Sequence, residues 1–190
     1  MTWKALGITT GGASMKQEHI IKRIAKFEKV SRGQFEKDFL DTFGGDAPWE
    51  EAYERVAIPR RATAGSAGYD FITPVDITLK PGESVKVPTG IRASMEMGWV
   101  LQIYPRSGLG FKYRLQLNNT VGIVDSDYYY SDNEGHIFVK LTNDSREGKI
   151  LKLEAGSGFA QGIFMEFGIT EDDDASAFRN GGFGSTTGNI

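Results

Sequence analysis

From Val56 onward the chain is a series of short β-prone runs, each bounded by Gly, Pro or Asn. The clearest runs are residues 75–79, 84–88, 99–104, 136–141 and 162–167. Runs of this length and composition at close spacing are typical of a β-sandwich or β-barrel. The 24 glycines among 190 residues exceed the roughly 7% average, which fits a fold with many turns. We therefore predict an all-β core over residues 56–170.

Composition excludes several classes of site. The chain has no cysteine, so disulfides, thiolate zinc sites, iron–sulfur clusters and cysteine nucleophiles are impossible. Its 22 Lys+Arg against 25 Asp+Glu give a net charge of −3, and no global positive field is available for nucleic acid. No apolar run reaches the roughly 18 residues of a membrane span, and residues 1–14 do not read as a signal peptide. We expect a cytoplasmic protein with no membrane or nucleic-acid partner.

Before the β-rich region we expect a flexible leader, residues 1–15, and a short helical extension, residues 16–55. Apolar residues from 20 to 27 have helix-like spacing, although residues 24–30 could equally form a short strand. Ser31 and Gln34 fit a capping box, and Gly44 supplies a helix stop. A second short helix opens near Pro48 with two glutamates in its first turn. We expect both helices to pack on the surface.

After the β-rich region an acidic linker and a mobile arm are expected over residues 171–190. The arm is rich in Gly, Ser and Thr, whose amides and hydroxyls suit phosphate oxygens, but it lacks the ending of a Walker loop. Phe183 can stack on a base while Arg179 holds phosphate. The pattern indicates a nucleotide lid, with an unstructured terminus as the alternative.

Two internal segments carry possible chemistry. Arg106 and Ser107 follow a predicted strand and suit phosphate, although the segment could be only a turn. Asp125 follows an apolar run, where an aspartate either caps a turn or acts as a base on water. His19 and His136 are the only histidines, and we interpret them as solvated or packed side chains rather than catalytic ones.

Five segments taken together resemble a known signature. In chain order they are Ala-Gly-Tyr-Asp-Phe at 67–71, Pro-Arg-Ser-Gly-Leu at 105–109, Gly-Ile-Val-Asp-Ser-Asp-Tyr at 122–128, Gly-Phe-Ala-Gln at 158–161 and Arg-Asn-Gly-Gly-Phe-Gly-Ser-Thr at 179–186. This order is similar to the five motifs of the trimeric dUTP diphosphatases (dUTPases), over about residues 56–188. The resemblance implies a jelly-roll, a homotrimer whose sites use more than one subunit, and an arm that closes over nucleotide.

The resemblance also implies roles for single residues. Asp125 matches the catalytic acid that activates water for attack on the α-phosphorus of dUTP, giving dUMP and pyrophosphate. Such a reaction keeps uracil out of DNA and supplies dUMP for dTMP synthesis. Asp70 matches the carboxylate that holds Mg²⁺ through water, and Tyr128 matches the residue that packs under the deoxyribose and excludes a 2′-hydroxyl.

The remaining matched positions are substrate-binding groups. Arg106 and Ser107 match the phosphate-binding pair, and Asn119 and Gln161 match polar groups near the α-phosphate. In the arm, Phe183 matches the uracil-stacking residue. The rest of the implied binding set is Gly108, Gly122, Arg179, Gly184, Ser185 and Thr186.

The chain departs from the family pattern at three places. Residues 129–133 lengthen the hairpin that reads uracil, Gly158 stands where many members have arginine, and Gly110 replaces the usual alanine. Two rival interpretations follow: a dCTP deaminase of the same superfamily, or a phage-type dUTPase that also binds a regulatory protein. The motif from Asp125 to Tyr128 and the Phe183 arm favour phosphate chemistry.

Overall fold

The computed structural model describes residues 21–176. The whole of the expected leader and the arm residues from 177 on lie outside this range. In chain order the elements are β1 (Ala25–Lys29), α1 (Arg32–Phe43), α2 (Trp49–Arg55), β2 (Arg60–Arg61), β3 (Tyr69–Ile72), β4 (Ile77–Leu79), β5 (Ser84–Pro88), β6 (Ile91–Met95), β7 (Trp99–Pro105), α3 (Ser107–Tyr113), β8 (Leu115–Leu117), β9 (Gly122–Val124), the 3-10 helix η1 (Ser126–Tyr130), β10 (Phe138–Asn143), β11 (Leu151–Leu153) and β12 (Gly158–Glu166). Each of the five predicted runs overlaps a strand.

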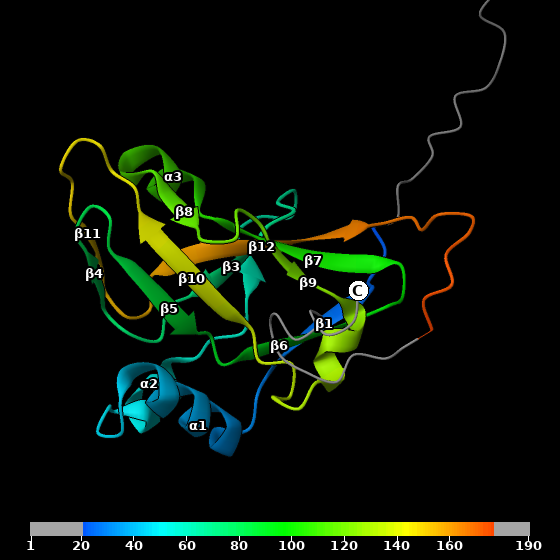
Figure 1. The fold of residues 1–190 in the computed structure, drawn as a ribbon, viewed down its shortest axis with the longest axis horizontal. Helices are drawn as coiled ribbons and strands as arrows, with labels where there is room; N and C mark the ends of the chain where they lie inside the picture. Colours follow the sequence, from blue (N-terminus) through cyan, green and yellow to red (C-terminus); the bar gives the residue numbers. More distant parts are fainter. Residues whose placement is uncertain (1–20, 177–190) are drawn as a thin grey trace, which may run out of the picture.

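The strands form a jelly-roll (Figure 1). The largest sheet has the order β2-β3-β12-β7-β9, and a second sheet has the order β5-β10-β8. Two further pairs, β1-β6 and β11-β4, complete the strands of the described region. All of these pairings are antiparallel, and β12 lies between β3 and β7 although it follows them by many residues. The predicted all-β class is confirmed.

The segment before the core contributes a strand as well as helices. β1 pairs with β6 over its whole length, from Ala25↔Met95 to Lys29↔Ile91, so the strand alternative for residues 24–30 is confirmed. Helix α1 begins as predicted, because the Ser31 side chain accepts a hydrogen bond from the Gln34 amide at 3.1 Å.

Contrary to our expectation, the two helices contribute side chains to the hydrophobic core and do not only pack on its surface. Phe35 and Phe39 of α1 are 0% and 2% exposed, and Ala52 of α2 is 1% exposed. They belong to the same hydrophobic cluster as jelly-roll residues such as Ile91 and Leu141. An apolar stripe shows that a helix packs against something, but it does not show how deep that contact lies.

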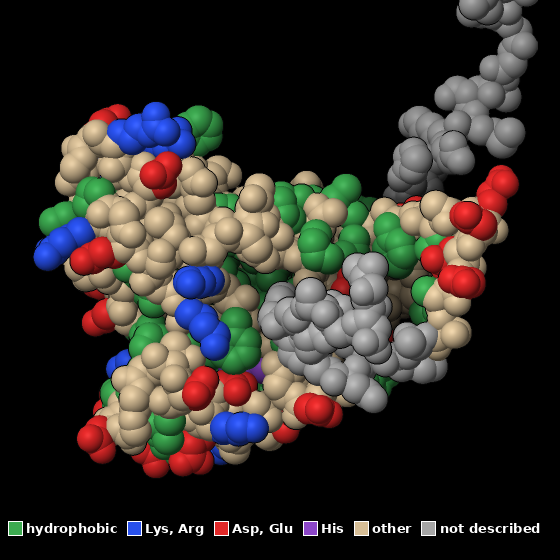
Figure 2. Space-filling model, in the orientation of Figure 1, with side chains coloured by type: hydrophobic (Ala, Val, Ile, Leu, Met, Phe, Trp, Pro, Cys, Tyr) green, Lys and Arg blue, Asp and Glu red, His purple; other side chains and the backbone are tan. Residues whose placement is uncertain are grey.

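The surface carries charges of both signs. On the face drawn in Figure 2, acidic side chains gather over α1 and α2 and at the end of the described chain, and basic ones are scattered. Within residues 21–176, no helix combines the length and the apolar composition needed to cross a membrane.

Candidate active site

One end of the large sheet brings together three of the predicted site residues. In the register of β3, β12 and β7, Asp70 lies opposite Gln161, and Gln161 lies opposite Tyr104, close to the end of β7. Arg106 follows β7 directly, and its Nε lies 3.3 Å from Asp70 Oδ1. Gln161 donates from Nε2 to the Pro105 carbonyl at 3.1 Å. Residues 70, 106 and 161, which belong to three of the motifs, therefore form one polar cluster.

This cluster lines a pocket of about 400 Å³. Besides Asp70, Arg106 and Gln161, its wall includes Ser66 and the first residues of α3, Ser107 and Gly108. The segment after β7, for which a plain turn was the alternative to a phosphate site, forms the start of a short helix. An arginine, a hydroxyl and a carboxylate facing one open pocket suit a phosphate chain with an associated cation.

Gly158, the departure from the family's usual arginine, has a structural reason. A Cβ at this position would lie 2.6 Å from Arg106 Nη1 and 3.0 Å from Arg106 Cδ. The glycine therefore leaves the space that the Arg106 side chain occupies beside the pocket. The positive charge at this wall comes from the end of β7 and not from β12.

Asp125 and Tyr128 lie at the other end of β7. β9 pairs with β7 through Val124↔Leu101, which places Asp125 level with Val100, six residues before Arg106. At about 3.3 Å per residue, this is a separation of roughly 20 Å along the strand. One chain thus carries the predicted site as two separate halves, which we call the phosphate half (Asp70, Arg106, Ser107, Gln161) and the base half (Asp125, Tyr128).

In the base half Asp125 is exposed and directly precedes η1. Its side chain makes no capping hydrogen bond to that helix, and its role as a base on water stays a prediction. Tyr128 is 1% exposed, and its hydroxyl donates to the His136 carbonyl at 2.7 Å. The contact between this ring and a deoxyribose stays a prediction.

Asn119 and Gly122 lie on either side of the start of β9. Asn119 is exposed in the turn after β8, and its main-chain carbonyl accepts a hydrogen bond from the Val121 amide at 2.7 Å. Gly122 is buried and pairs with Ile103. Neither residue lines the pocket of the phosphate half. Arg179, Phe183, Gly184, Ser185 and Thr186 lie outside the described residues.

The described residues offer no ready-made metal cage. Nowhere in residues 21–176 do three His, Cys, Asp or Glu side chains gather closely enough to hold an ion. Asp70 is a single carboxylate with a 26% exposed side chain, open to the pocket beside Arg106. This donor set fits a hard cation whose remaining ligands are triphosphate oxygens and water.

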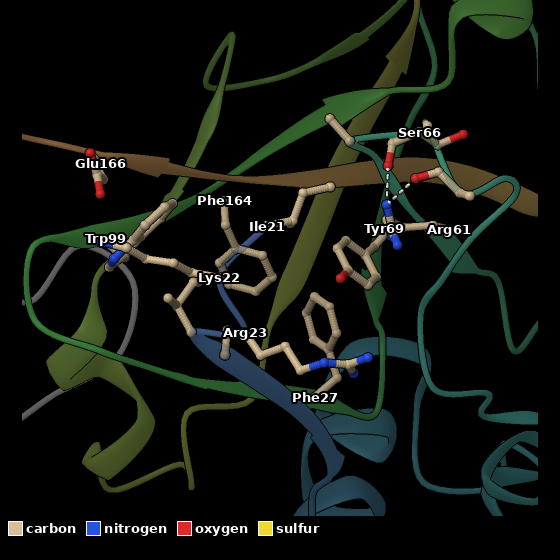
Figure 3. A pocket seen from close by; sticks show the side chains of 15 residues that line it. Ile21, Lys22, Arg23, Phe27, Arg61, Ser66, Tyr69, Trp99, Phe164 and Glu166 are labelled. Carbon is tan, nitrogen blue, oxygen red and sulfur yellow. Dashed lines mark hydrogen bonds between the residues drawn. The ribbon is translucent and has the colours of Figure 1, made fainter. Parts of the chain in front are cut away.

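A larger pocket, about 680 Å³, was not predicted from the sequence (Figure 3). Aromatic rings from four strands line it: Phe27, Tyr69, Trp99 and Phe164. Arg61 stands at its edge and donates to the carbonyls of Ala64 and Ser66 at 2.8 and 3.0 Å. None of the predicted catalytic or substrate-binding side chains lines this pocket.

The sequence also missed a buried pair beside the base half. His136 is 0% exposed, as expected of a packed histidine, and its Nδ1 lies 2.6 Å from Asp38 Oδ2. Burial raises the pKa of Asp38, but hydrogen bonds from His136 and Gln34 outweigh it and leave the pKa below its ordinary value of 3.8. The 98 residues between the partners hide this contact from any local pattern.

Comparison with known proteins agrees with the geometry. The dUTPase family model matches residues 54–187. The deoxyuridine 5′-triphosphate nucleotidohydrolase of Lactococcus lactis is 42% identical over 134 residues, which cover 69% of this chain and 88% of that protein. The corresponding protein of Chromobacterium violaceum is 40% identical over 144 residues, 72% of this chain and 91% of that protein.

Solved structures give the same answer. The crystal structure of dUTPase from Streptococcus mutans is similar with a TM-score of 0.57 and 36% identity, over 76% of this chain and 98% of that chain. The dUTPase from phage phi11 of S. aureus, 18% identical with a TM-score of 0.57, covers 82% of this chain and 98% of that chain, and shows a shared fold only. With the family model spanning both halves of the site, the chain belongs to the dUTPase family.

Proposed function

We propose that this protein hydrolyses dUTP to dUMP and pyrophosphate by attack of water on the α-phosphorus. The observation that carries the proposal is the phosphate half: Asp70, Arg106, Ser107 and Gln161 share one pocket, although they come from three separate motifs. The named relatives and the family match support dUTP as the substrate. A cytoplasmic location, removal of dUTP before it reaches DNA, and supply of dUMP for dTMP synthesis are parts of the same proposal.

In this proposal each residue has one role in binding or catalysis. Arg106 and Ser107 bind phosphate oxygens, and Gln161 lies at the same wall with its amide oriented by the Pro105 carbonyl. Asp125 accepts the proton of the attacking water at its carboxylate, which is general-base catalysis. Asn119 is a further polar contact near the α-phosphate, Gly108 lies in the pocket wall, and Gly122 is a further proposed substrate contact.

Mg²⁺ is the proposed cofactor. Asp70 would hold it through water beside the phosphates. When bound, the ion supplies positive charge that neutralises the triphosphate and fixes its geometry. Arg106, already 3.3 Å from Asp70, holds that carboxylate at the pocket wall.

A homotrimer is the proposed assembly, because a single chain places the two halves of the site roughly 20 Å apart. The phosphate half of one protomer can meet the base half of the next. Such a contact joins two different surfaces and forms a ring when the rotation between protomers closes, for which the resemblance indicates three members.

The arm completes the proposed site. Phe183 stacks on uracil, Arg179, Ser185 and Thr186 hold the terminal phosphate, and Gly184 lets the backbone approach it. Arm closure excludes water other than the nucleophile. A regulatory protein partner stays a prediction.

The test is hydrolysis of dUTP with Mg²⁺ in water enriched in ¹⁸O, followed by mass spectrometry of the products. Attack at the α-phosphorus puts the label in dUMP and leaves pyrophosphate unlabelled. Label in pyrophosphate, or release of inorganic phosphate, would contradict the proposed reaction.

A further inference from the structure

The segment before the family match holds the loop that follows Tyr128. We call residues 129–136 the long loop; it contains the residues that lengthen the family's uracil hairpin. The family model begins at residue 54, after β1 and α1. Three contacts join β1 and α1 to the long loop: the Tyr129 hydroxyl donates to Glu28, the amide and hydroxyl of Ser31 donate to the Glu134 carboxylate at 2.8 and 2.7 Å, and the His136 ring meets Asp38.

Of the three contacts, the one between His136 and Asp38 involves a fully buried ring. The position of the proton on that ring follows from its hydrogen bonds. The Gly90 amide donates to His136 Nε2 at 2.8 Å, so that nitrogen carries no proton. The neutral ring therefore carries its proton on Nδ1 and donates it to Asp38 Oδ2 at 2.6 Å. The same carboxylate oxygen accepts from Gln34 Nε2 at 2.8 Å, which orients it on α1. Asp38 thus fixes both the position and the tautomer of a ring with no solvent contact.

The main chain of His136 then fixes Tyr128. Its carbonyl accepts from the Tyr128 hydroxyl at 2.7 Å and from Asn133 Nδ2 at 3.3 Å. Asn133 Nδ2 also donates to the Tyr128 hydroxyl at 2.9 Å, which closes the loop on itself. A continuous set of hydrogen bonds therefore runs from Asp38 on α1 to the tyrosine at the base half of the site.

We propose that Asp38 is a positioning residue for the nucleotide: through His136 it holds the long loop and Tyr128 in the geometry that receives a deoxyribonucleoside. This inference rests on the proposed function. A loop released from α1 has to be ordered each time substrate binds, and that entropy cost weakens binding. Asp125 is held differently, since β9 fixes it through pairing with β7. Loss of the Asp38 contact therefore acts on KM and on sugar selectivity more than on kcat.

The experiment compares Asp38→Ala with Asp38→Asn and with Asp41→Ala, an exposed aspartate of the same helix. For Asp38→Ala, KM for dUTP rises about tenfold, as expected for a lost hydrogen bond to a charged group, and kcat stays within about threefold. The ratio of kcat/KM for dUTP to that for UTP falls by about the same factor. Asp38→Asn keeps an oxygen acceptor for Nδ1, so its KM and its preference for dUTP stay close to the wild-type values. Asp41→Ala behaves as wild type.

Two results would overturn the proposal. One is a folded Asp38→Ala protein with wild-type KM and wild-type dUTP preference, which would leave Asp38 a purely structural group. The other is a loss of kcat at constant KM. If Asp38→Ala does not fold, Glu134→Ala cuts the exposed link to Ser31 instead and should raise KM in the same direction by about threefold; an unchanged KM there also overturns it. Wild-type protein without dUTP turnover would contradict the proposed function, on which this inference rests, whereas the two results above contradict the role of Asp38 alone.

Discussion

At the scale of single residues, position decides what each carboxylate can do. Asp70 lies within reach of an arginine, Asp38 is partly buried against a histidine, and Asp125 is exposed at the end of a strand. In the proposed function the same chemical group serves phosphate and cation binding, loop positioning and proton transfer. Of the three, Asp125 is the proposed base.

Replacing that base separates chemistry from binding. Asp125→Asn keeps the size of the side chain but cannot accept the proton of water, so turnover of dUTP should fall by about 10²–10⁴-fold. Affinity for dUTP, measured by calorimetry, should change little because the lost group acts on water. Asp132→Asn, an exposed aspartate of the long loop, is the matched control. Near-wild-type turnover of the Asp125 variant would remove it from the mechanism.

Asp38 should also contribute to stability in a pH-dependent way. Its pKa is lower in the folded chain than its ordinary value of 3.8, so the unfolded state takes up its proton first as the pH falls. The contribution is complete above 3.8 and is lost as the pH falls through the lower folded pKa. The difference in urea midpoint between wild type and Asp38→Asn should be largest at pH 7 and shrink below pH 3.8.

Asp41→Asn removes one negative charge from the same helix and controls for the change in net charge. A difference between wild type and Asp38→Asn that grows as the pH falls would contradict the direction of the Asp38 shift.

At the scale of elements, the segment before residue 56 is part of the fold and not an attachment. β1 adds a strand to β6, and Phe35 and Phe39 enter the common core. The junction is tight at Gly90, which has φ of +72°: a Cβ there would lie 2.5 Å from Val56 Cγ2. The helices and the jelly-roll should therefore unfold together.

A pair of glycine substitutions tests this junction. Gly90→Ala places a Cβ on a left-handed backbone and against the Val56 side chain. It should lower the unfolding free energy by about 2–5 kcal/mol. Gly98→Ala has a similar φ of +83° but no atom within 4 Å of its Cβ, and should cost about 1–2 kcal/mol. Equal losses of unfolding free energy for the two variants in urea denaturation would show that the contact with Val56 relaxes at little cost.

The arm is tested as an element by deleting residues 179–190. Without it the site stays open to water, and dUTP turnover should fall by about 10²-fold or more, a loss typical of catalytic positioning. Sedimentation should still show the trimer, because the proposed ring contacts involve the sheet and not the arm. Unchanged kinetics would exclude the arm from the mechanism.

At the scale of the whole molecule, the two halves of the site explain why the chain should act as an oligomer. A mostly apolar strip that surrounds Gln102 on the outer face of the large sheet supports the same idea. Ile123, Gln102 and Ile163 are cross-strand neighbours on one face, and Met165 follows on it. Ile123 and Met165 are 43% and 44% exposed in the single chain, which suits an interface.

A charge placed on this strip should break the ring. Met165→Glu should give a smaller species in sedimentation and lose most dUTP turnover, because the two halves no longer meet. Met97→Glu, the same change at a residue 92% exposed in the turn before β7, should keep both the trimer and its activity. An intact, active Met165→Glu trimer would move the interface elsewhere.

Much of this fold could be predicted from the sequence, because its signals are local. The capping pair Ser31 and Gln34 gave the start of α1, and the short β-prone runs gave the jelly-roll class. The five motifs gave the cluster of Asp70, Arg106 and Gln161. Contacts across about 100 residues, such as Asp38 with His136, leave no local pattern. The separation of Asp125 from Arg106 required the register of β9 on β7.

The most direct test of the account is release of pyrophosphate from dUTP, UTP, dCTP and dTTP in parallel with Mg²⁺, with ammonia measured in the dCTP sample. If the proposed function is correct, we expect rapid pyrophosphate release from dUTP, little from the other three nucleotides, and no ammonia. Ammonia from dCTP would place the protein with the deaminases, and equal release from dUTP and UTP would contradict selection at the sugar.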